Sequence, residues 1–256
     1  MSSPKTILFL GATGGVGLST LRRSLAANHT CVALCRTPSK LSAEFPNNNP
    51  PANLHLVQGD ALDADVLARC LLVGPAPSSD RRLVDTIIFS IGGRPTLRGM
   101  SDPHVCENGM AALLRALREV MTTKSATTTK PKPPPRLVAV STTGITDQAR
   151  DIPLPMVPLY KGLLHTPHKD KKAMERLVMD AGVETVAWTL IRGSLYTNGP
   201  ATEGLVREGM EDPVTGVVTS TAVGYTISRE DVGKWVFENC VEGGTKWVGK
   251  AAVLSY

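Results

Sequence analysis

Three glycines near the N-terminus have the spacing of a phosphate-binding loop. Gly11, Gly14 and Gly17 lie in the run GATGGVG, between the apolar segment Thr6–Leu10 and a segment with helical periodicity. Glycine lets the backbone turn sharply and approach a pyrophosphate, while the following helix N-terminus offers unpaired N–H groups and the positive end of its dipole. The run therefore predicts a dinucleotide site. Its expected contacts are Gly11, Thr13, Gly14, Gly15, Val16 and Gly17.

The end of the second apolar run indicates which dinucleotide binds. A Rossmann domain that prefers NAD usually carries Asp or Glu there, which accepts from the ribose 2′-OH. This chain has Arg36 directly after Cys35, with Lys40 close behind. A guanidinium fits a 2′-phosphate, so the sequence favours NADP(H) over NAD(H). The alternative is that Arg36 is a solvated residue at the end of a strand.

Small and polar residues also follow the third and fourth apolar runs. In open α/β sheets, ligands bind in the crevice at the carboxyl ends of the strands. An Asp there can accept from the adenine amino group, and small residues let the backbone pass close to ribose and phosphate. The additional cofactor contacts expected on this basis are Asp60, Ala61, Ser90, Ile91 and Gly92.

The elements that must position these residues alternate along the chain. Short apolar runs lie at Thr6–Leu10, Cys31–Cys35, Leu54–Val57, Thr86–Phe89, Leu137–Val140 and Thr185–Ile191, with a seventh near Trp247–Leu254. Most have no polar alternation, as is typical of strands buried on both faces. Helical segments are expected at Val16–Ala27, Asp63–Cys70, Val105–Met121, Lys169–Ala181 and Arg229–Cys240. This order predicts an α/β, doubly wound, mostly parallel sheet.

The length of 256 residues suits one Rossmann domain spanning 1–256. Residues 122–135 read TTKSATTTKPKPPP, which predicts a flexible surface loop because the segment holds little apolar surface to bury. Residues from about 151 to 225 are expected to contribute the substrate pocket. A fairly apolar small molecule is the expected substrate, on the basis of Met156, Val157, Leu159, Leu163 and Leu164.

The bulk composition argues against several classes of partner. The net charge of +5 comes from scattered basic residues, and aromatic residues make up only 4%, so an anionic small ligand is favoured over nucleic acid. The five cysteines include no C-x-x-C pair, which favours a reducing compartment and core thiols and argues against bound metal. No apolar stretch has the length of a signal or membrane segment. The expectation is a cytoplasmic monomer or homodimer.

Several motifs together resemble the atypical short-chain dehydrogenase/reductases, in particular the NmrA-like and NAD(P)H-binding branch. They are GATGGVG, LCRTPSKL, VQGDALD, VSTTG, ERLVMDAGVETVAWTLIRGSLYTNGP and ISREDVGKWV, and they extend over almost the whole chain. The resemblance implies strand order 3-2-1-4-5-6 with a small C-terminal substrate region. It also implies hydride transfer between NAD(P)H and a carbonyl, alkene or imine.

The resemblance assigns catalytic candidates as well, with one departure. Classical members use a Ser after the fifth strand and Tyr-x-x-x-Lys on the next helix, which implies Ser141 and Lys171, both also near the nicotinamide ribose. No Tyr precedes Lys171 by four residues, and a shifted register gives His168-x-x-x-Lys172. The proton donor is therefore open among Tyr160, His168 and a water bound to Ser141. The catalytic candidates are Ser141, Lys171 and Tyr160, of which Ser141 and Lys171 also contact the cofactor.

Three functions compete on this basis. The first is an NADP(H)-dependent oxidoreductase that reduces a carbonyl or conjugated group of a small, fairly apolar molecule. The second is a dinucleotide-sensing NmrA-like regulator without turnover, which the missing Tyr favours. The third is a non-redox enzyme, an isomerase or cyclase, on the same fold. Consumption of the cofactor separates the first from the other two.

Overall fold

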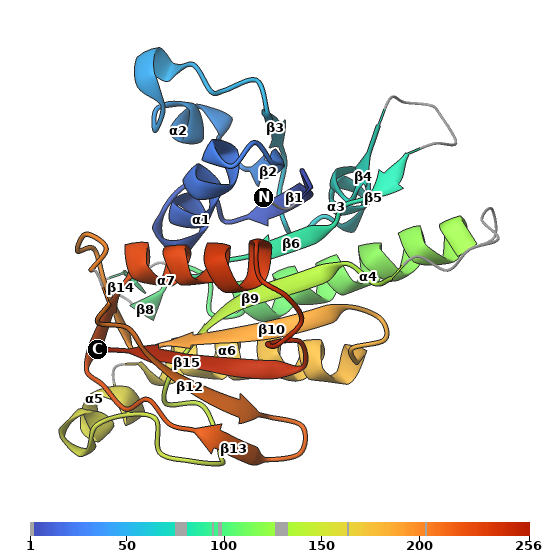
Figure 1. The fold of residues 1–256 in the computed structure, drawn as a ribbon. Coiled ribbons are helices and arrows are strands. Elements are labelled where there is room, and N and C mark those ends of the chain that lie inside the picture. Colours follow the sequence, from blue (N-terminus) through green and yellow to red (C-terminus); the bar gives the residue numbers. More distant parts are fainter. Residues whose placement is uncertain are drawn as a thin grey trace.

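The structure, a computed structural model, describes residues 3–74, 81–93, 95–96, 99–125, 133–162, 164–202 and 204–256. A nine-stranded sheet in the order β13-β12-β15-β10-β9-β6-β1-β2-β3 forms its centre (Figure 1). Seven strands are mutually parallel: β1 Thr6–Leu10, β2 Thr30–Cys35, β3 Leu54–Gln58, β6 Thr86–Phe89, β9 Arg136–Thr142, β10 Ala187–Gly193 and β15 Lys250–Ser255. Counted along the chain their order is 3-2-1-4-5-6-7. The predicted fold class, strand order and seventh strand are confirmed.

Two antiparallel strands extend the sheet beyond β15 and were not predicted. They are β12 Arg207–Asp212 and β13 Val217–Ser220, with β12 paired to β15. The sequence REGMED of β12 carries several charged residues around one apolar residue, and most side chains of both strands are exposed or half-buried. Edge strands of this kind show no apolar run, so hydrophobic periodicity does not detect them.

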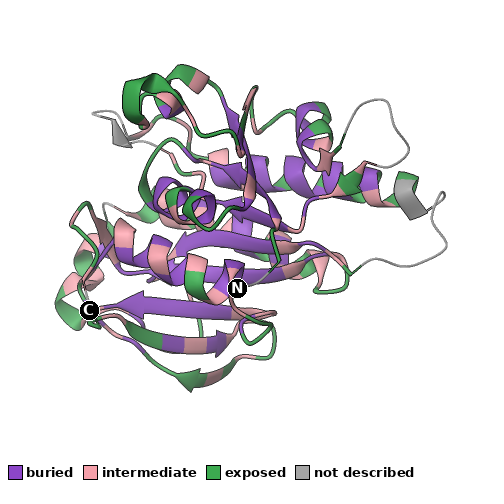
Figure 2. Cartoon of the chain, turned by 45° about the horizontal axis from the view of Figure 1, so that its top comes forward, coloured by how far each residue is buried: buried purple, intermediate pink, exposed green. Residues whose placement is uncertain are grey.

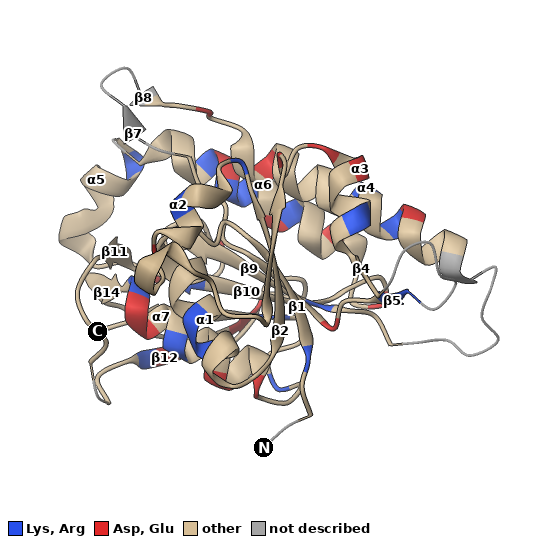
Figure 3. Cartoon of the chain, turned by 90° about the horizontal axis from the view of Figure 1, so that it is seen from above, with Lys and Arg blue, Asp and Glu red and all other residues tan. Residues whose placement is uncertain are grey.

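Helices cover both faces of the sheet, as the predicted double winding requires. α1 Gly15–Ala26 and α7 Arg229–Val236 lie on one face, and α7 continues into the π-helical turn Phe237–Val241. α3 Ala64–Cys70, α4 Val105–Ser125 and α6 His165–Ala181 lie on the other face (Figure 3). Side chains of each strand alternate between two cores: in β1, Ile7 and Phe9 face α1, while Leu8 and Leu10 face α3 and α4. Both faces are apolar because the strands are buried on both sides (Figure 2).

Short elements complete the described chain. They are α2 Pro38–Ser42, α5 Val157–Lys161, the 3₁₀ turns Pro46–Asn48 and Leu154–Met156, the parallel pair β11 Leu195–Thr197 and β14 Thr226–Ser228, and the two-residue strands β4 Leu72–Val73, β5 Arg82–Leu83, β7 Pro95–Thr96 and β8 Gly99–Met100. Within the described ranges, no helix is long and apolar enough to cross a membrane.

Two helices begin at a residue whose side chain caps the helix N-terminus. The Asp63 carboxylate accepts from the backbone N–H groups of Asp65 and Val66 at the start of α3. The Ser228 hydroxyl accepts from the backbone N–H of Asp231 at 3.0 Å at the start of α7. Such caps satisfy N–H groups that have no partner within the helix. They fix where α3 and α7 begin.

The loop predicted at 122–135 is wrong for its first four residues. α4 extends to Ser125, and the hydroxyls of Thr122 and Thr123 donate to the carbonyls of Arg118 and Glu119, four residues earlier, at 2.8 and 2.9 Å. Threonine therefore continues the helix here by bonding back to the preceding turn, a choice that composition alone does not reveal. Residues 126–132 of the predicted loop lie outside the described residues.

All five cysteines are free and buried, as core thiols are. Burial raises the pKa of Cys31 to about 12, so this thiol stays protonated at neutral pH. The prediction that Cys31 and Cys35 belong to the core is confirmed.

Candidate functional site

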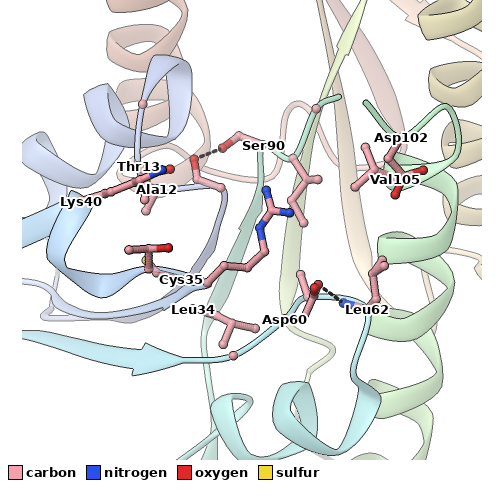
Figure 4. Close-up of a pocket in the computed structure, with 18 of the residues that line it drawn as sticks. Ala12, Thr13, Leu34, Cys35, Lys40, Asp60, Leu62, Ser90, Asp102 and Val105 are labelled. Carbon is pink, nitrogen blue, oxygen red and sulfur yellow. Dashed lines mark hydrogen bonds between the residues drawn. The ribbon is translucent and has the colours of Figure 1, made fainter. Parts of the chain in front are cut away.

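A cavity of about 540 Å³ opens at the carboxyl ends of β1, β2, β3 and β6. Most of the predicted cofactor contacts line it: Gly11, Thr13, Gly14, Arg36, Lys40, Asp60, Ala61, Ser90, Ile91 and Gly92. Figure 4 shows Thr13, Lys40, Asp60 and Ser90 around this space, each from the segment that follows a different strand. The topology brings these loops together because parallel neighbouring strands end at the same edge of a sheet.

The loop between β1 and α1 leaves room for a ligand at its centre. A Cβ added to Gly14 would meet no atom within 4 Å, and no side chain caps the N-terminus of α1. The first-turn N–H groups of α1 are therefore available to an anion. Gly17 has another role, because it does not line this cavity. A Cβ there would lie 2.3 Å from Ser90 Oγ and 2.4 Å from the Gly11 carbonyl oxygen, so Gly17 allows α1 to pack closely on β1 and β6.

Two cations stand at the rim of this first cavity. Arg36 and Lys40 are both exposed, and their side chains make no hydrogen bond or ion pair with any described residue. The carboxylate of Asp60, by contrast, accepts from the backbone N–H of Leu62 at 3.0 Å, which orients it at the end of β3. Two unneutralised positive charges beside a hollow suit an anionic group of a ligand.

A second cavity of about 690 Å³ adjoins the first. Gly14, Ser90, Ile91, Gly92 and Arg229 line both, so the two form one continuous site. The second is bordered by the end of β9, by α6 and by β11. Its other described lining residues are Gly15, Val16, Gly93, Met100, Val140, Ser141, Thr142, Tyr160, Leu164, Thr166, Pro167, His168, Lys171, Leu195 and Tyr196.

Ser141 and Lys171 both line the second cavity. The Ser141 hydroxyl is buried and has no hydrogen-bond partner among the described residues. Lys171 Nζ donates to the carbonyl oxygens of Ile91 at 2.8 Å and Val140 at 2.7 Å. A buried hydroxyl without a partner is costly, so a ligand that brought an acceptor or donor to Ser141 would remove that cost. Lys171 holds a positive charge beside it.

Contacts on either side of Lys171 fix α6 in the fold. The Asp170 carboxylate accepts from the N–H groups of Cys106 and Glu107 at 3.0 and 2.8 Å, at the start of α4. One turn after Lys171, the buried Glu175 pairs with Arg192 of β10 at 2.7 Å. Burial alone would lower the pKa of the Arg192 guanidinium. The carboxylates of Glu175 and Glu211 have the larger combined effect and raise this pKa. Lys171 is therefore presented from a rigid element.

Tyr160 and His168 lie against each other at the same cavity, with ring centroids 5.1 Å apart. The Tyr160 hydroxyl is 3.3 Å from Thr143 Oγ1, and burial raises the pKa of Tyr160. Burial, with a smaller effect of His165, lowers the pKa of His168 to about 4, so its imidazole is neutral at pH 7. Within the described structure, Lys171 Nζ is bonded to carbonyl oxygens rather than to Tyr160. The Tyr–Lys pair of classical relatives is not reproduced.

The predicted substrate segment contributes fewer apolar residues than expected. Of those named from sequence, Leu164 lines the second cavity, together with Leu195 and Tyr196 from the same expected segment. Met156, Val157 and Leu159 do not, because the short helix α5 turns only Tyr160 into the interior. Leu163 lies outside the described residues. The remaining apolar lining comes from elsewhere in the chain, including Met100 and Val140.

Sequence reasoning missed Arg229, the first residue of α7, which lines both cavities. Its only local signal is the capping Ser228 before it, and that signal marks a helix start rather than a binding site. Arg229 is more than two hundred residues from the glycine loop. Only the packing of α7 on α1 brings the two together.

The sheet, the glycine loop and the crevice define a Rossmann-type dinucleotide-binding protein. A family model described as NAD(P)H-binding matches residues 11–242. The chain therefore belongs to this NAD(P)H-binding family. The family resemblance read from the motifs is confirmed.

Two curated relatives from fungi match the full chain. Reductase pytE of Aspergillus terreus is 38% identical over 273 residues, covering 100% of this chain and 99% of its own length. Oxidase pynE of Aspergillus niger is 35% identical over 286 residues, with the same coverage of 100% and 99%. A short-chain dehydrogenase/reductase of Veillonella parvula, solved in complex with NADP, shares the fold with a TM-score of 0.67 at 14% identity, covering 99% of this chain and 95% of that one. These matches place the chain among oxidoreductase enzymes.

Proposed function

We propose that this protein is an NADP(H)-dependent oxidoreductase that reduces a carbonyl or conjugated group of a small, fairly apolar molecule. The observation that carries the proposal is the continuous site itself. Exposed Arg36 and Lys40 mark one end, and buried Ser141 with half-buried Lys171 marks the other. NADP(H) has two ends that correspond to these: its phosphorylated adenosine fits the basic end of the site, and its reactive nicotinamide fits the end with Ser141 and Lys171.

The chain's own residues hold such a cofactor in a definite direction. Arg36 and Lys40 would bind the 2′-phosphate, Asp60 would face the adenine, and the backbone N–H groups at the start of α1, after Gly14, would donate to the pyrophosphate. Lys171 holds the nicotinamide ribose from α6. When bound, the reduced nicotinamide supplies a hydride. The phosphate loop fits the group because Gly14 leaves open space beside an uncapped helix end.

Ser141 and Lys171 then act on the substrate. The unpartnered Ser141 hydroxyl donates to the substrate oxygen and orients it. The Lys171 ammonium stabilises the negative charge that develops on that oxygen. Tyr160, or a water in the cavity, supplies the proton that completes the reduction, since neutral His168 holds no acidic proton at pH 7. The apolar lining at Met100, Val140 and Leu164 selects an apolar substrate.

Replacing Arg36 by alanine tests the choice of cofactor. A charge-assisted contact to the 2′-phosphate contributes about 1.5–3 kcal/mol, so Arg36→Ala is expected to reduce the preference for NADPH over NADH by roughly tenfold or more. Calorimetric titration of both dinucleotides measures this. Arg22→Ala is the matched control, because Arg22 is an exposed arginine of α1 paired with Glu44 outside the site. Equal affinities of the unmodified protein for NADPH and NADH would contradict the assignment.

A dinucleotide-sensing regulator is the second candidate, and one observation favours it. Lys171 bonds to backbone carbonyls and Tyr160 to Thr143, so no Tyr–Lys acid is assembled within the described site. A regulator would bind NADPH tightly and never consume it. Absorbance at the NADPH band, followed with a panel of ketones, enones and quinones, distinguishes the two functions.

A further inference from the structure

We propose that Arg229, the first residue of α7, binds the dinucleotide phosphate nearer the nicotinamide, beside the glycine loop. This inference rests on the proposed function, since it takes the ligand to be a dinucleotide. Arg229 lines both cavities and is half-buried. Gly14, where the pyrophosphate crosses, also lines both. A cation and an uncapped helix N-terminus therefore lie at the same part of the site.

The position of Arg229 relative to the loop is fixed by the packing of α7 on α1. Ser19 Oγ donates to Glu230 Oε2 at 2.9 Å, and Arg23 pairs with the same carboxylate at 3.0 Å. At Gly233 a Cβ would lie 2.2 Å from Ser19 Oγ, so the two helices touch at backbone distance. The arginine stem is held against the loop itself, because a Cβ at Gly15 would lie 3.2 Å from Arg229 Cδ.

The charge of Arg229 is available to a ligand. None of the ion pairs found among the described residues includes it. Its Nη1 donates to two neutral acceptors, the Tyr196 carbonyl oxygen at 3.1 Å and Asn198 Oδ1 at 2.8 Å, and its guanidinium carbon is 5.6 Å from the centre of the Tyr196 ring. These contacts orient the guanidinium without neutralising it. Because both hydrogen bonds use Nη1, the N–H groups of Nη2 and Nε can donate to phosphate oxygens.

The surroundings indicate which phosphate is bound. Gly15 and Tyr196, the two residues in contact with Arg229 at the loop and at β11, line the second cavity and not the first. The adenosine end is marked instead by Arg36 and Lys40 in the first cavity. Arg229 is also linked to the proposed substrate site. It donates to the Tyr196 carbonyl oxygen, and the Tyr196 hydroxyl donates to the Ser141 carbonyl oxygen at 2.9 Å. The nicotinamide-side phosphate is therefore its ligand.

Two ligands and two arginine variants test this assignment. NADPH carries both phosphates of the pyrophosphate, whereas adenosine 2′,5′-bisphosphate lacks the nicotinamide-side one. Arg229→Gln is expected to weaken NADPH binding by about tenfold, the typical loss of a charge-assisted contact, and to change adenosine 2′,5′-bisphosphate binding by less than about twofold. Arg229→Lys keeps the charge and recovers part of the loss. Arg22→Gln removes a positive charge from α1 outside the site, where Arg22 pairs with Glu44, and leaves both affinities unchanged.

Salt dependence gives a readout that a purely structural role would not move. NADPH affinity of the unmodified protein is expected to fall more steeply with NaCl than that of Arg229→Gln, because salt screens the lost ion pair. Unchanged NADPH affinity in a folded Arg229→Gln, or equal losses for both ligands, overturns the inference. If the unmodified protein binds neither ligand, the proposed function itself fails, and the two failures are thereby distinguished.

Discussion

Replacing Gly14 by valine is expected to abolish dinucleotide binding while the protein stays folded. The Gly14 backbone has φ 171°, an extended conformation that valine adopts readily, and a Cβ there meets no protein atom within 4 Å. The new side chain therefore occupies the space at the junction of the two cavities, where the pyrophosphate must lie. We expect NADPH affinity to fall by about a hundredfold or more, equivalent to roughly 2.8 kcal/mol.

Two other glycines give the matched comparison. A Cβ at Gly244 would also meet no atom within 4 Å, and this residue lies outside both cavities, so Gly244→Val should leave NADPH binding unchanged. Gly17→Val should instead destabilise the protein, because its side chain would collide with Ser90 and Gly11. Calorimetric titration and thermal melting separate these outcomes. An unaltered NADPH titration in folded Gly14→Val would refute the phosphate-loop assignment.

Loss of Ser141 or Lys171 is expected to slow catalysis strongly. Ser141 presents a buried hydroxyl without a protein partner among the described residues, and Lys171 carries the cation beside it. Once a substrate is found, Ser141→Ala and Lys171→Ala should each lower kcat/KM by at least about tenfold, a loss of about 1.4 kcal/mol of transition-state stabilisation. His168→Ala should lower it by less than about threefold, because neutral His168 supplies no charge and no acidic proton.

The neighbouring lysine provides the control for charge and helix position. Lys172 pairs with the exposed Asp147 and does not line the second cavity. Lys172→Ala should therefore leave kcat/KM nearly unchanged. Steady-state kinetics with NADPH and the substrate measure all four variants. A large loss in His168→Ala and Lys172→Ala, with Lys171→Ala nearly silent, would mean that the His168-x-x-x-Lys172 register is the working one.

The parts of the molecule that could be predicted are those with strong local signals. The parallel strands are short apolar runs, and the glycine loop follows the first of them, so these strands and the first cavity could be predicted from sequence. The order of the strands in the sheet came from the family resemblance. β12 was not predicted because an edge strand with charged side chains has no such apolar run. Arg229 was not predicted as a site residue because its position depends on the packing of α7 against α1, two segments that are far apart in the sequence.

Other features needed the three-dimensional contacts of single side chains. Gly17 belongs to the glycine pattern, but its distance from Ser90 and Gly11 shows that it serves packing rather than lining. Tyr160 was a candidate acid because the family resemblance implies a Tyr before Lys171. Its contacts with Thr143 and His168 form only when the segment folds back on β9. Local sequence records which groups are present, while tertiary packing decides which of them meet.

Hydrogen exchange followed by mass spectrometry, with and without saturating NADPH, tests the central claim most directly. The account places the dinucleotide along the carboxyl ends of β1, β2, β3 and β6 and onward to α6. NADPH should therefore slow exchange in peptides that contain the Gly11–Gly17 loop, the segment after β2 with Arg36, and the segment after β6 with Ile91. Peptides from β12 and β13, on the far edge of the sheet, should be unaffected. Protection confined to β12 and β13, or no protection at all, would contradict the account.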